Sequence, residues 1–397
     1  MDHSIANENE LYFERGGPAY RLMQRIGLIQ QDRPSIKRRI IAFLAVTCLP
    51  LLALAWWEGH AIGPTPRESL LLDFAAFARF LVAIPVLVIA EVVIGPRTTT
   101  AGLHFLRAGI VNSEDYPAFE RAVRRLARLR EPLAAELVLV GMAVIGAWVF
   151  TAETVYGGAI ANWHVAAIKT GGSTRLSSAG LWYHIVSVPV IQFFWYRWLW
   201  RYLIWIRFLF DVSRLNLRLV PTHADGAGGL GFLGTTHAVF GILSFGLSAV
   251  LSGAAAFLIV FEGARIESFQ VHFITVLAAV EVVFLGPLVM FTPALMAARQ
   301  TWMRQYSLLV IRYNRDFHEK WVEGKASEGE PLLGTSDIQS LADLGNSFQF
   351  IREMRTVPFT LRVMLQLAVV TLLPALPLIL LVVPIERILD LVTKAVF

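Results

Sequence analysis

Hydrophobic residues gather in long continuous runs along the chain, and polar residues are concentrated in the connections between the runs. Seven runs approach or exceed the roughly 20 residues that a helix needs to cross a bilayer. They cover Ile40 to Trp57, Leu70 to Ile94, Leu133 to Ala152, Leu181 to Leu203, His237 to Phe261, Val271 to Ala297 and Leu361 to Val383. Prolines inside the runs predict kinks at Pro50, Pro85, Pro189, Pro287, Pro293, Pro374 and Pro377. We expect an all-α fold, a polytopic membrane bundle of about seven transmembrane helices.

The connections between these runs are alternately rich and poor in Lys and Arg. The N-terminal segment and the second, fourth and sixth connections are rich, whereas the others carry only Arg67, then Lys169 and Arg175, then Arg265. Basic residues favour the cytoplasmic side of a membrane. The alternation predicts a cytoplasmic N-terminus and an external C-terminus. It also supports the count of seven, because merging or splitting any span would break it.

The same pattern divides the chain into four parts. These are a cytoplasmic or interfacial N-terminal segment, the bundle of the first six spans, a cytoplasmic helical segment, and the last span with a short external tail, over residues 1–39, 40–298, 299–358 and 359–397. Within the bundle, residues 113–132 predict an amphipathic cytoplasmic helix that Ser113 caps. A second cytoplasmic helix is expected to start at Thr335 or Ser336 and to run to about Met354.

Composition agrees with a membrane protein, since 56% of the 397 residues are hydrophobic and 16% are charged. The single cysteine, Cys48, excludes a disulfide framework within the chain and a Cys-rich metal site. The basic residues form no dense tract, so membrane orientation explains them better than nucleic-acid binding. The sequence lacks zinc-protease, P-loop and hydrolase motifs. We therefore expect no catalytic residue, no metal and no cofactor, and we do not expect an enzyme.

Ionisable side chains within the predicted spans are candidates for function, because a charge at membrane depth is costly. Arg79 and Glu281 fall near mid-span, and an ion pair between them is the simplest expectation. Glu91 and His272 lie closer to span ends, where their side chains can reach the interface. Such a pair either locks two helices together or forms a charged constriction on a solute path.

The inner half of the fourth span carries a basic stripe interleaved with aromatic residues. Its arginines share one face of the helix, and they are Arg197, Arg201, Arg207, Arg214 and Arg218. The stripe has three interpretations. It is an interfacial belt, an anion-attracting vestibule, or a groove for acidic lipid headgroups.

A glycine-rich loop, PTHADGAGGLGFLG at 221–234, lies between the fourth and fifth spans. It matches the G-x-G-x-x-G pattern of dinucleotide sites, but it follows a membrane helix rather than a strand, and no acidic residue follows at the required distance. The nucleotide interpretation therefore fails. Two interpretations of the loop remain: a tight turn, or a gate or hinge at the cytoplasmic surface. The residues that would form it are Asp225, Gly226, Gly228, Gly229 and Gly231.

Several segments of the chain resemble a family of uncharacterised bacterial multi-pass inner-membrane proteins. They are the glycine-rich loop, LLGTSDIQSLADLGNSF at 332–348, IREMRTVPF at 351–359, and the apolar tail with LLPALPL. The resemblance implies placement in a bacterial inner membrane and implies no activity.

Two functions are compatible with these features. The first is a channel or transporter for a small ion or solute, including an anionic one, with the glycine-rich loop as gate or hinge. The second is a non-enzymatic membrane scaffold or sensor that binds lipid headgroups or a protein. Membrane lipids and an anionic ligand or headgroup are the expected partners. A homo-oligomer is expected as well, because small residues such as Ala249 and Gly253 line one face of the fifth span.

Overall fold

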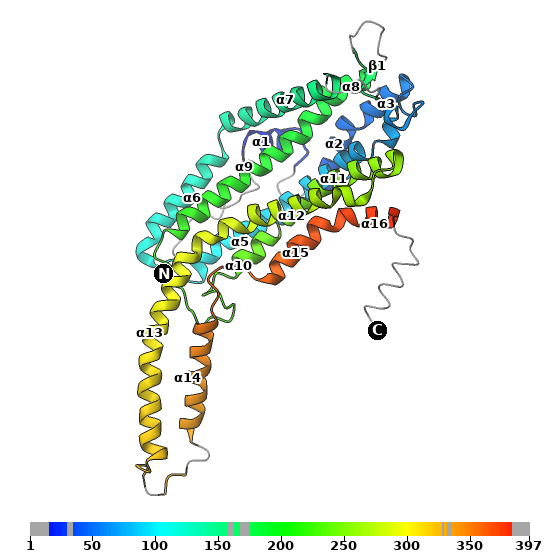
Figure 1. Cartoon of the computed structure of the whole chain (residues 1–397). Coiled ribbons are helices and arrows are strands. Elements are labelled where there is room, and N and C mark those ends of the chain that lie inside the picture. Colours follow the sequence, from blue (N-terminus) through cyan, green and yellow to red (C-terminus); the bar gives the residue numbers. More distant parts are fainter. Residues whose placement is uncertain are drawn as a thin grey trace.

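The computed structural model describes residues 16–29, 35–156, 162–166, 175–327, 329–331 and 335–382, without the side chains of 150–156. The described chain is almost entirely helical. Long helices lie side by side in an elongated bundle, and a two-helix arm projects from one end of it (Figure 1). The external tail expected after the last span falls outside the described residues.

The described residues of the bundle form seven helical rods, and most of these consist of two or three helical segments joined end to end. In chain order they are α2 (Ile36–Thr47) with α3 (Leu49–Trp57); α4 (Phe74–Phe77), η4 (Ala78–Ala83) and α5 (Ile84–Arg107); α7 (Leu133–Tyr156); α8 (Ser178–Trp182), η6 (Tyr183–Ser187) and α9 (Val188–Ser213); α10 (Phe232–Ala238) with α11 (Gly241–Glu262); α12 (Gln270–Leu285), η8 (Gly286–Phe291) and α13 (Thr292–Phe317); and α15 (Leu361–Leu372), η10 (Leu373–Ala375) and α16 (Leu376–Val382).

Shorter elements complete the described chain. They are α1 (Pro18–Arg25), η2 (Pro66–Glu68), η3 (Leu70–Leu72), η5 (Ser113–Asp115), α6 (Tyr116–Arg130), the antiparallel pair β1 (Val165–Ala166) and β2 (Arg175–Leu176), η7 (Ile266–Phe269), η9 (His318–Val322) and α14 (Ser336–Glu353). Helices α6 and α14 correspond to the two connecting helices that the sequence predicts, and their cytoplasmic location stays a prediction.

Five of the helical stretches in the described chain are long and apolar enough to cross a membrane. A sixth joins them if the bent pair α6 and α7, at 50° to each other, counts as one span. The rod from Ser178 to Ser213 is absent from this set, because its arginines and aromatic residues lower its hydropathy. The helices of the described chain therefore support a multi-pass membrane protein with five or six apolar spans, and the predicted count of seven and the predicted orientation stay predictions.

The predicted proline kinks coincide with junctions between helical segments. Pro85 and Pro189 each occupy the first turn of an α-helix, α5 and α9, and each follows a π-helical turn, η4 or η6. Proline lacks the N–H that would continue the regular ladder, so the backbone changes its helical pitch there. Such turns are frequent at functional sites, and both of these carry side chains of the candidate site.

The core of the bundle lies between α5 and α9, where Leu87, Phe105 and Phe208 are fully shielded from solvent. The small-residue face of α11 packs within the same chain. A Cβ added to Gly253 would lie 2.6 Å from the carbonyl oxygen of Phe74, on α4. This face therefore serves close packing inside the protomer, and it offers no support for the expected homo-oligomer.

Candidate functional site

A cavity of about 370 Å³, lined by both polar and apolar residues, lies at the end of the bundle opposite the arm. The segment before α5, the loop at 162–166 and the end of α11 line it. Apolar residues of α11 form one wall, and the polar side chains that line the cavity are Arg67, Asp73, Arg79, Asn162, His164 and Glu262. We call this space the Arg79 cavity. It has the volume and the mixed lining of a site for a small organic molecule.

Arg79 reaches the cavity from the π-helical turn η4. Its guanidinium Nη1 donates a hydrogen bond to the hydroxyl of Tyr183, which lies fully buried on the π-helical turn η6. The expected pair with Glu281 is not formed. Glu281 lies on α12, and its Oε2 is buried without a hydrogen-bond partner among the described residues. Sequence position placed both charges near mid-span, but the bundle separates them.

Asp73 and Trp163 fix the rim of the Arg79 cavity. The Asp73 carboxylate accepts hydrogen bonds from the backbone N–H of Ala76, at 2.8 Å, and from the indole N–H of Trp163, at 3.0 Å. The ring of His164 stacks on Trp163 with 3.6 Å between centroids. Burial, with the nearby His184 and Arg79, holds the pKa of His164 well below its usual value. His164 is therefore neutral at physiological pH, and its buried Nδ1 has no partner among the described residues.

Glu91 is the centre of a buried ion network between α2, α5 and α9. Its Oε1 accepts hydrogen bonds from Arg197, at 2.7 Å, and from Arg201, at 3.0 Å, while its Oε2 accepts one from Arg39. All four side chains are nearly inaccessible, with residue exposures between 4 and 7%. Such extensive burial of charge is sustained only by close pairing. The sequence position of Glu91 suggests a side chain at the membrane interface, but the structure buries this side chain between three helices.

Among the described residues of this network, guanidinium groups outnumber carboxylates. The nearest further acid is Glu136, whose Oε1 lies 3.9 Å from Nε of Arg197. Three guanidinium groups therefore face two carboxylates among the described residues. Nε of Arg39 and Nη2 of Arg197 are buried and have no hydrogen-bond partner there. Within the described residues, the network around Glu91 thus carries more positive than negative charge.

The remaining arginines of the stripe do not join the network. Arg207 pairs with Asp211 at 2.9 Å on the exposed surface of α9. The guanidinium of Arg214 lies 4.8 Å from the ring centroid of Phe210. Arg218 lies beyond the helix, where its backbone N–H donates to the carbonyl oxygen of Ile110 at 2.7 Å. The predicted stripe is therefore divided, with its first two members turned inward and the others outside the core.

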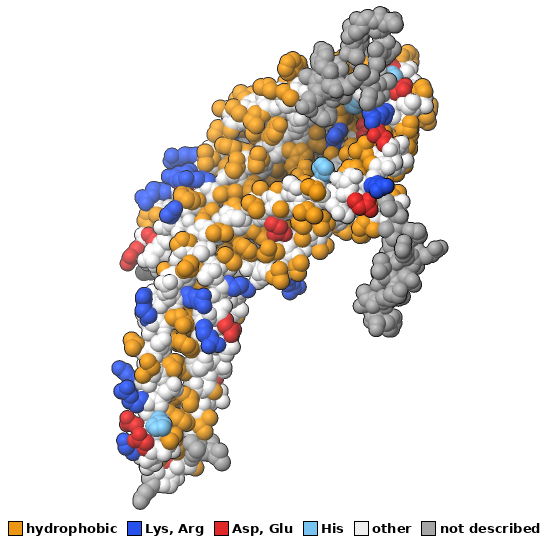
Figure 2. All heavy atoms as spheres, in the orientation of Figure 1, with side chains coloured by type: hydrophobic (Ala, Val, Ile, Leu, Met, Phe, Trp, Pro, Cys, Tyr) orange, Lys and Arg blue, Asp and Glu red, His pale blue; other side chains and the backbone are white. Residues whose placement is uncertain are grey.

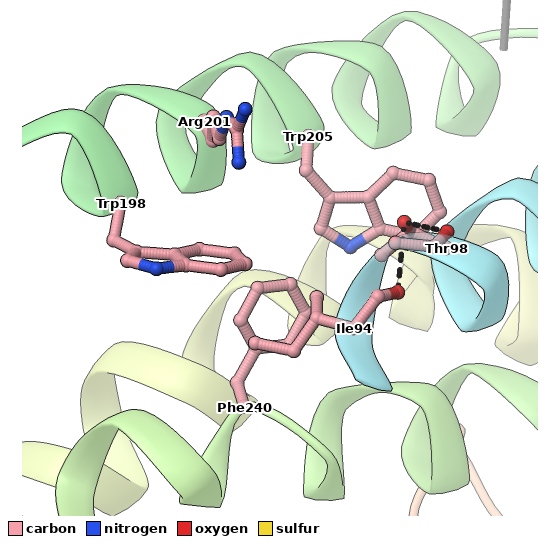
Figure 3. A pocket seen from close by; sticks show the side chains of 7 residues that line it. Ile94, Thr98, Trp198, Arg201, Trp205 and Phe240 are labelled. Atoms are coloured by element: carbon pink, nitrogen blue, oxygen red, sulfur yellow. Dashed lines mark hydrogen bonds between the residues drawn. The ribbon is translucent and has the colours of Figure 1, made fainter. Parts of the chain in front are cut away.

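A second, much smaller space adjoins Arg201 (Figure 3). Trp198, Trp205, Thr98 and Phe240 surround it, and its volume is about 10 Å³. That is room for about one water molecule. The Thr98 hydroxyl is bonded back to its own helix, at 2.9 Å from the carbonyl oxygen of Gly95. In this conformation the space beside Arg201 is too small for a solute.

The glycine-rich loop folds around its own carboxylate. Asp225 accepts hydrogen bonds from the backbone N–H groups of Ala227, Gly229 and Gly231, at 2.8, 3.1 and 2.8 Å. Burial alone would raise the pKa of Asp225, but these hydrogen bonds and one involving His223 outweigh burial and hold its pKa below the usual value. The amides that a phosphate would require are thus occupied by a side chain of the loop itself.

The loop also holds the base of the arm. The carbonyl oxygen of Gly226 accepts the backbone N–H of Arg355 at 2.8 Å, and the Arg355 guanidinium donates to the carbonyl oxygen of Asp225. Gly226, Gly228 and Gly229 have φ of 60°, 64° and 96°, a conformation that favours glycine. The contacts between this loop and the 351–359 segment form what we call the loop clamp.

His272 lies exposed at the start of α12, outside the lining of the cavities described above, and its ring centroid lies 6.3 Å from that of Phe269. Within the described residues, no group of three His, Cys, Asp or Glu side chains is arranged to hold a metal ion. Sequence reasoning missed Tyr183, Trp163 and His164, because only the fold brings them to Arg79.

No protein-family model, curated protein or solved structure matches this chain. The resemblance to bacterial inner-membrane proteins therefore stays a prediction from the sequence.

Proposed function

We propose that this chain is a membrane transporter for a small solute that carries a carboxylate or phosphate group, and that the Arg79 cavity is its binding site. The observation that carries the proposal is the position of Arg79, a guanidinium within a membrane bundle that lines a cavity of about 370 Å³. Guanidinium groups recognise carboxylate and phosphate through paired N–H donors. Neutral His164 and Asn162, which line the same cavity, add neutral hydrogen-bonding groups for orientation.

The proposal includes a topology of seven spans, with the N-terminus in the cytoplasm of a bacterial inner membrane. The rod from Ser178 to Ser213 supports this count, because it packs along α7 within the bundle (Figure 1). Its two inner arginines are paired within the protein, so they do not face lipid. In this topology the Arg79 cavity opens to the outside and the arm lies in the cytoplasm.

The Glu91 network supports a transporter that changes conformation rather than an open channel. It fills the region between α2, α5 and α9 with paired charges. Passage of a solute there requires these pairs to open, and the excess of arginines favours an anion over a cation at that step. In this proposal the loop clamp is the cytoplasmic hinge, because it joins the end of α9 to the arm.

Uptake into proteoliposomes tests the proposal. Lactate, succinate and inorganic phosphate serve as probes, and potassium serves as the cation comparison. We expect uptake of at least one anion, a loss of tenfold or more in Arg79→Gln, and partial retention in Arg79→Lys. Arg207→Gln is the matched control, since it removes an exposed arginine whose partner is Asp211. The proposal is wrong if no anion is taken up or if Arg79→Gln and Arg207→Gln transport equally.

The arm favours a second function, a scaffold or sensor that binds a protein. Helices α13 and α14 pack against each other and project away from the bundle (Figure 1). They expose large apolar side chains, among them Leu308, Ile311 and Phe350, at 72, 56 and 57%. Cross-linking from the arm in intact membranes tests this function. A specific cross-linked partner, together with absence of anion uptake, would favour it over transport.

A further inference from the structure

The outer face of α6 carries a cluster of exposed arginines. The opposite face of this helix is buried against α9, where the ring of Phe119 lies 5.7 Å from that of Phe208, between centroids. The arginines on the outer face are Arg121, Arg124, Arg125 and Arg128, and all four are exposed. They fall within an arc of about 100° at 3.6 residues per turn. We call them the α6 basic face, and none of them lines the Arg79 cavity.

Two of these arginines have a carboxylate partner and two have none. The pairs are Arg124 with Glu120, at 3.3 Å, and Arg125 with Asp211, at 2.7 Å. Within the described residues, the guanidinium groups of Arg121 and Arg128 form no ion pair. They are seven residues apart, so they lie on the same side of the helix, about two turns or roughly 10 Å apart along it. Both groups therefore present their N–H donors to the surroundings of the protein.

The α6 basic face borders the apolar surface of the bundle. Helix α6 bends by 50° into α7, and the first turns of α7 expose Leu133, Leu137 and Val138, at 58, 60 and 61%. Figure 2 shows basic side chains gathered beside the apolar surface, in the region where α6 lies in Figure 1. Lipid headgroups lie directly outside the hydrocarbon core of a bilayer. A bilayer that covers the exposed apolar side chains of α7 therefore brings its headgroups to the α6 basic face.

Helix α1 independently indicates a membrane surface at the same level. It lies at the junction of α6 and α7, where Arg21 is 3.7 Å from Glu131. It exposes Leu22 and Ile26, at 58 and 60%, and Arg25 in its last turn is exposed as well. A helix that exposes apolar and basic side chains together is typical of the interface between headgroups and acyl chains.

We propose that the α6 basic face binds the phosphate groups of acidic phospholipids, with Arg121 and Arg128 as its main ligands. An exposed guanidinium donates paired hydrogen bonds to phosphate oxygens, and basic clusters on amphipathic helices attract anionic lipid. The positive charge of the face favours acidic over zwitterionic lipid, since a zwitterionic headgroup brings its own cation. The bilayer supplies this partner at the level where the arginines lie. The inference does not depend on transport by the Arg79 cavity.

Lipid retention by the full chain tests the inference. The protein is reconstituted into vesicles of equal parts phosphatidylglycerol and phosphatidylcholine and extracted into mild detergent, and native mass spectrometry counts its retained lipids. We expect phosphatidylglycerol to exceed phosphatidylcholine by about threefold or more. The double variant Arg121→Gln with Arg128→Gln should lower this ratio by about half or more, because it removes the two arginines without an acidic partner. Arg121→Lys with Arg128→Lys keeps the charge and should keep most of the ratio.

The matched control is Arg304→Gln with Arg312→Gln. These arginines are also exposed, but they lie on α13, in the arm that projects away from the bundle (Figure 1). The control removes the same charge and should keep the ratio of the unmodified chain. An equal fall in the two Gln double variants would overturn the inference, because it would assign the effect to net charge.

The unmodified chain provides a test that needs no variant. Raising the salt concentration during extraction from about 0.1 M to about 1 M shortens the range of electrostatic attraction from about 10 Å to about 3 Å. The ratio of phosphatidylglycerol to phosphatidylcholine should therefore fall. Equal retention of the two lipids at low salt, or a ratio that does not change with salt, would also overturn the inference.

Discussion

The substitution Glu91→Gln removes the one carboxylate that Arg39, Arg197 and Arg201 all contact. Glutamine keeps nearly the same size, but only one of its two terminal atoms accepts hydrogen bonds, so the change removes the charge and also places an NH₂ donor against an arginine. Three guanidinium groups then lie close together in the bundle, and among the described residues Glu136, 3.9 Å from Arg197, is the acid that remains beside them. We expect a large loss of stability, because a buried charge without its partner retains its full desolvation penalty.

The size of the loss follows from the burial and the distances. Two unit charges about 4 Å apart attract by roughly 4 kcal/mol at an effective dielectric constant near 20. The attractions to Glu91 are partly cancelled by repulsion among the arginines and by desolvation. Breaking a buried ion pair by removing one partner costs about 3–5 kcal/mol. At about 2 °C per kcal/mol for a long chain, the melting temperature should fall by roughly 6–10 °C.

The assay is thermal unfolding of purified protein in detergent, followed by tryptophan fluorescence. Glu120→Gln is the control, because Glu120 also pairs with an arginine, Arg124, at 3.3 Å, but on the exposed face of α6. An exposed pair four residues apart in a helix contributes only about 0.3–0.5 kcal/mol, so its loss should move the melting temperature by about 1 °C or less. Equal shifts in Glu91→Gln and Glu120→Gln would refute the desolvated network.

Two further predictions concern the loop clamp. Gly228→Ala forces alanine into a left-handed conformation and places Cβ 2.9 Å from Cε of Met354, so a loss of about 1–2 kcal/mol or more is expected in the same thermal assay. Gly345→Ala is the control, because a Cβ there meets nothing within 4 Å, and it should leave the stability unchanged or raise it. Equal losses of stability in the two variants would exclude backbone strain at Gly228 as the cause. The pKa of Asp225 lies below its unfolded value of about 3.9, so its stabilisation is present at neutral pH and is lost as the pH falls through the folded pKa. Asp225→Asn should therefore lower the melting temperature at pH 7 and converge with the unmodified chain in acid, and a difference that is independent of pH would contradict this.

The helical architecture could be predicted because its signals are local. Apolar runs of sufficient length, caps and prolines define α5, α9 and α14 without knowledge of their neighbours. The number of hydrophobic runs differs from the number of apolar helical stretches in the described chain, because the rod from Ser178 to Ser213 combines membrane length with arginines and aromatic residues. A membrane bundle can bury the arginines of this rod where a neighbouring helix supplies a carboxylate. The sequence of one helix does not show which helix packs against it.

The ion network could not be predicted for the same reason. Glu91 lies near the end of a hydrophobic run, so its position along the helix suggested an interfacial side chain. Only the packing of α2, α5 and α9 brings it to Arg197 and Arg201. The conformation of the glycine-rich loop, in contrast, could have been predicted from the sequence. Asp225 precedes amides at two, four and six positions along the chain, which is the local pattern of an aspartate that bonds its own turn.

Helix α13 continues from the bundle into the arm without a break over its 26 residues, a rod of roughly 39 Å at about 1.5 Å per residue. A force applied sideways near Phe317, at its far end, acts on the bundle as a bending moment that grows with this length. The counterforce arises at the root of the arm, where Arg355 is bonded to the glycine-rich loop. The stiffness of that short joint therefore sets how much of the force on the arm reaches the helices of the bundle, whatever the affinity of a molecule bound at the far end of the arm.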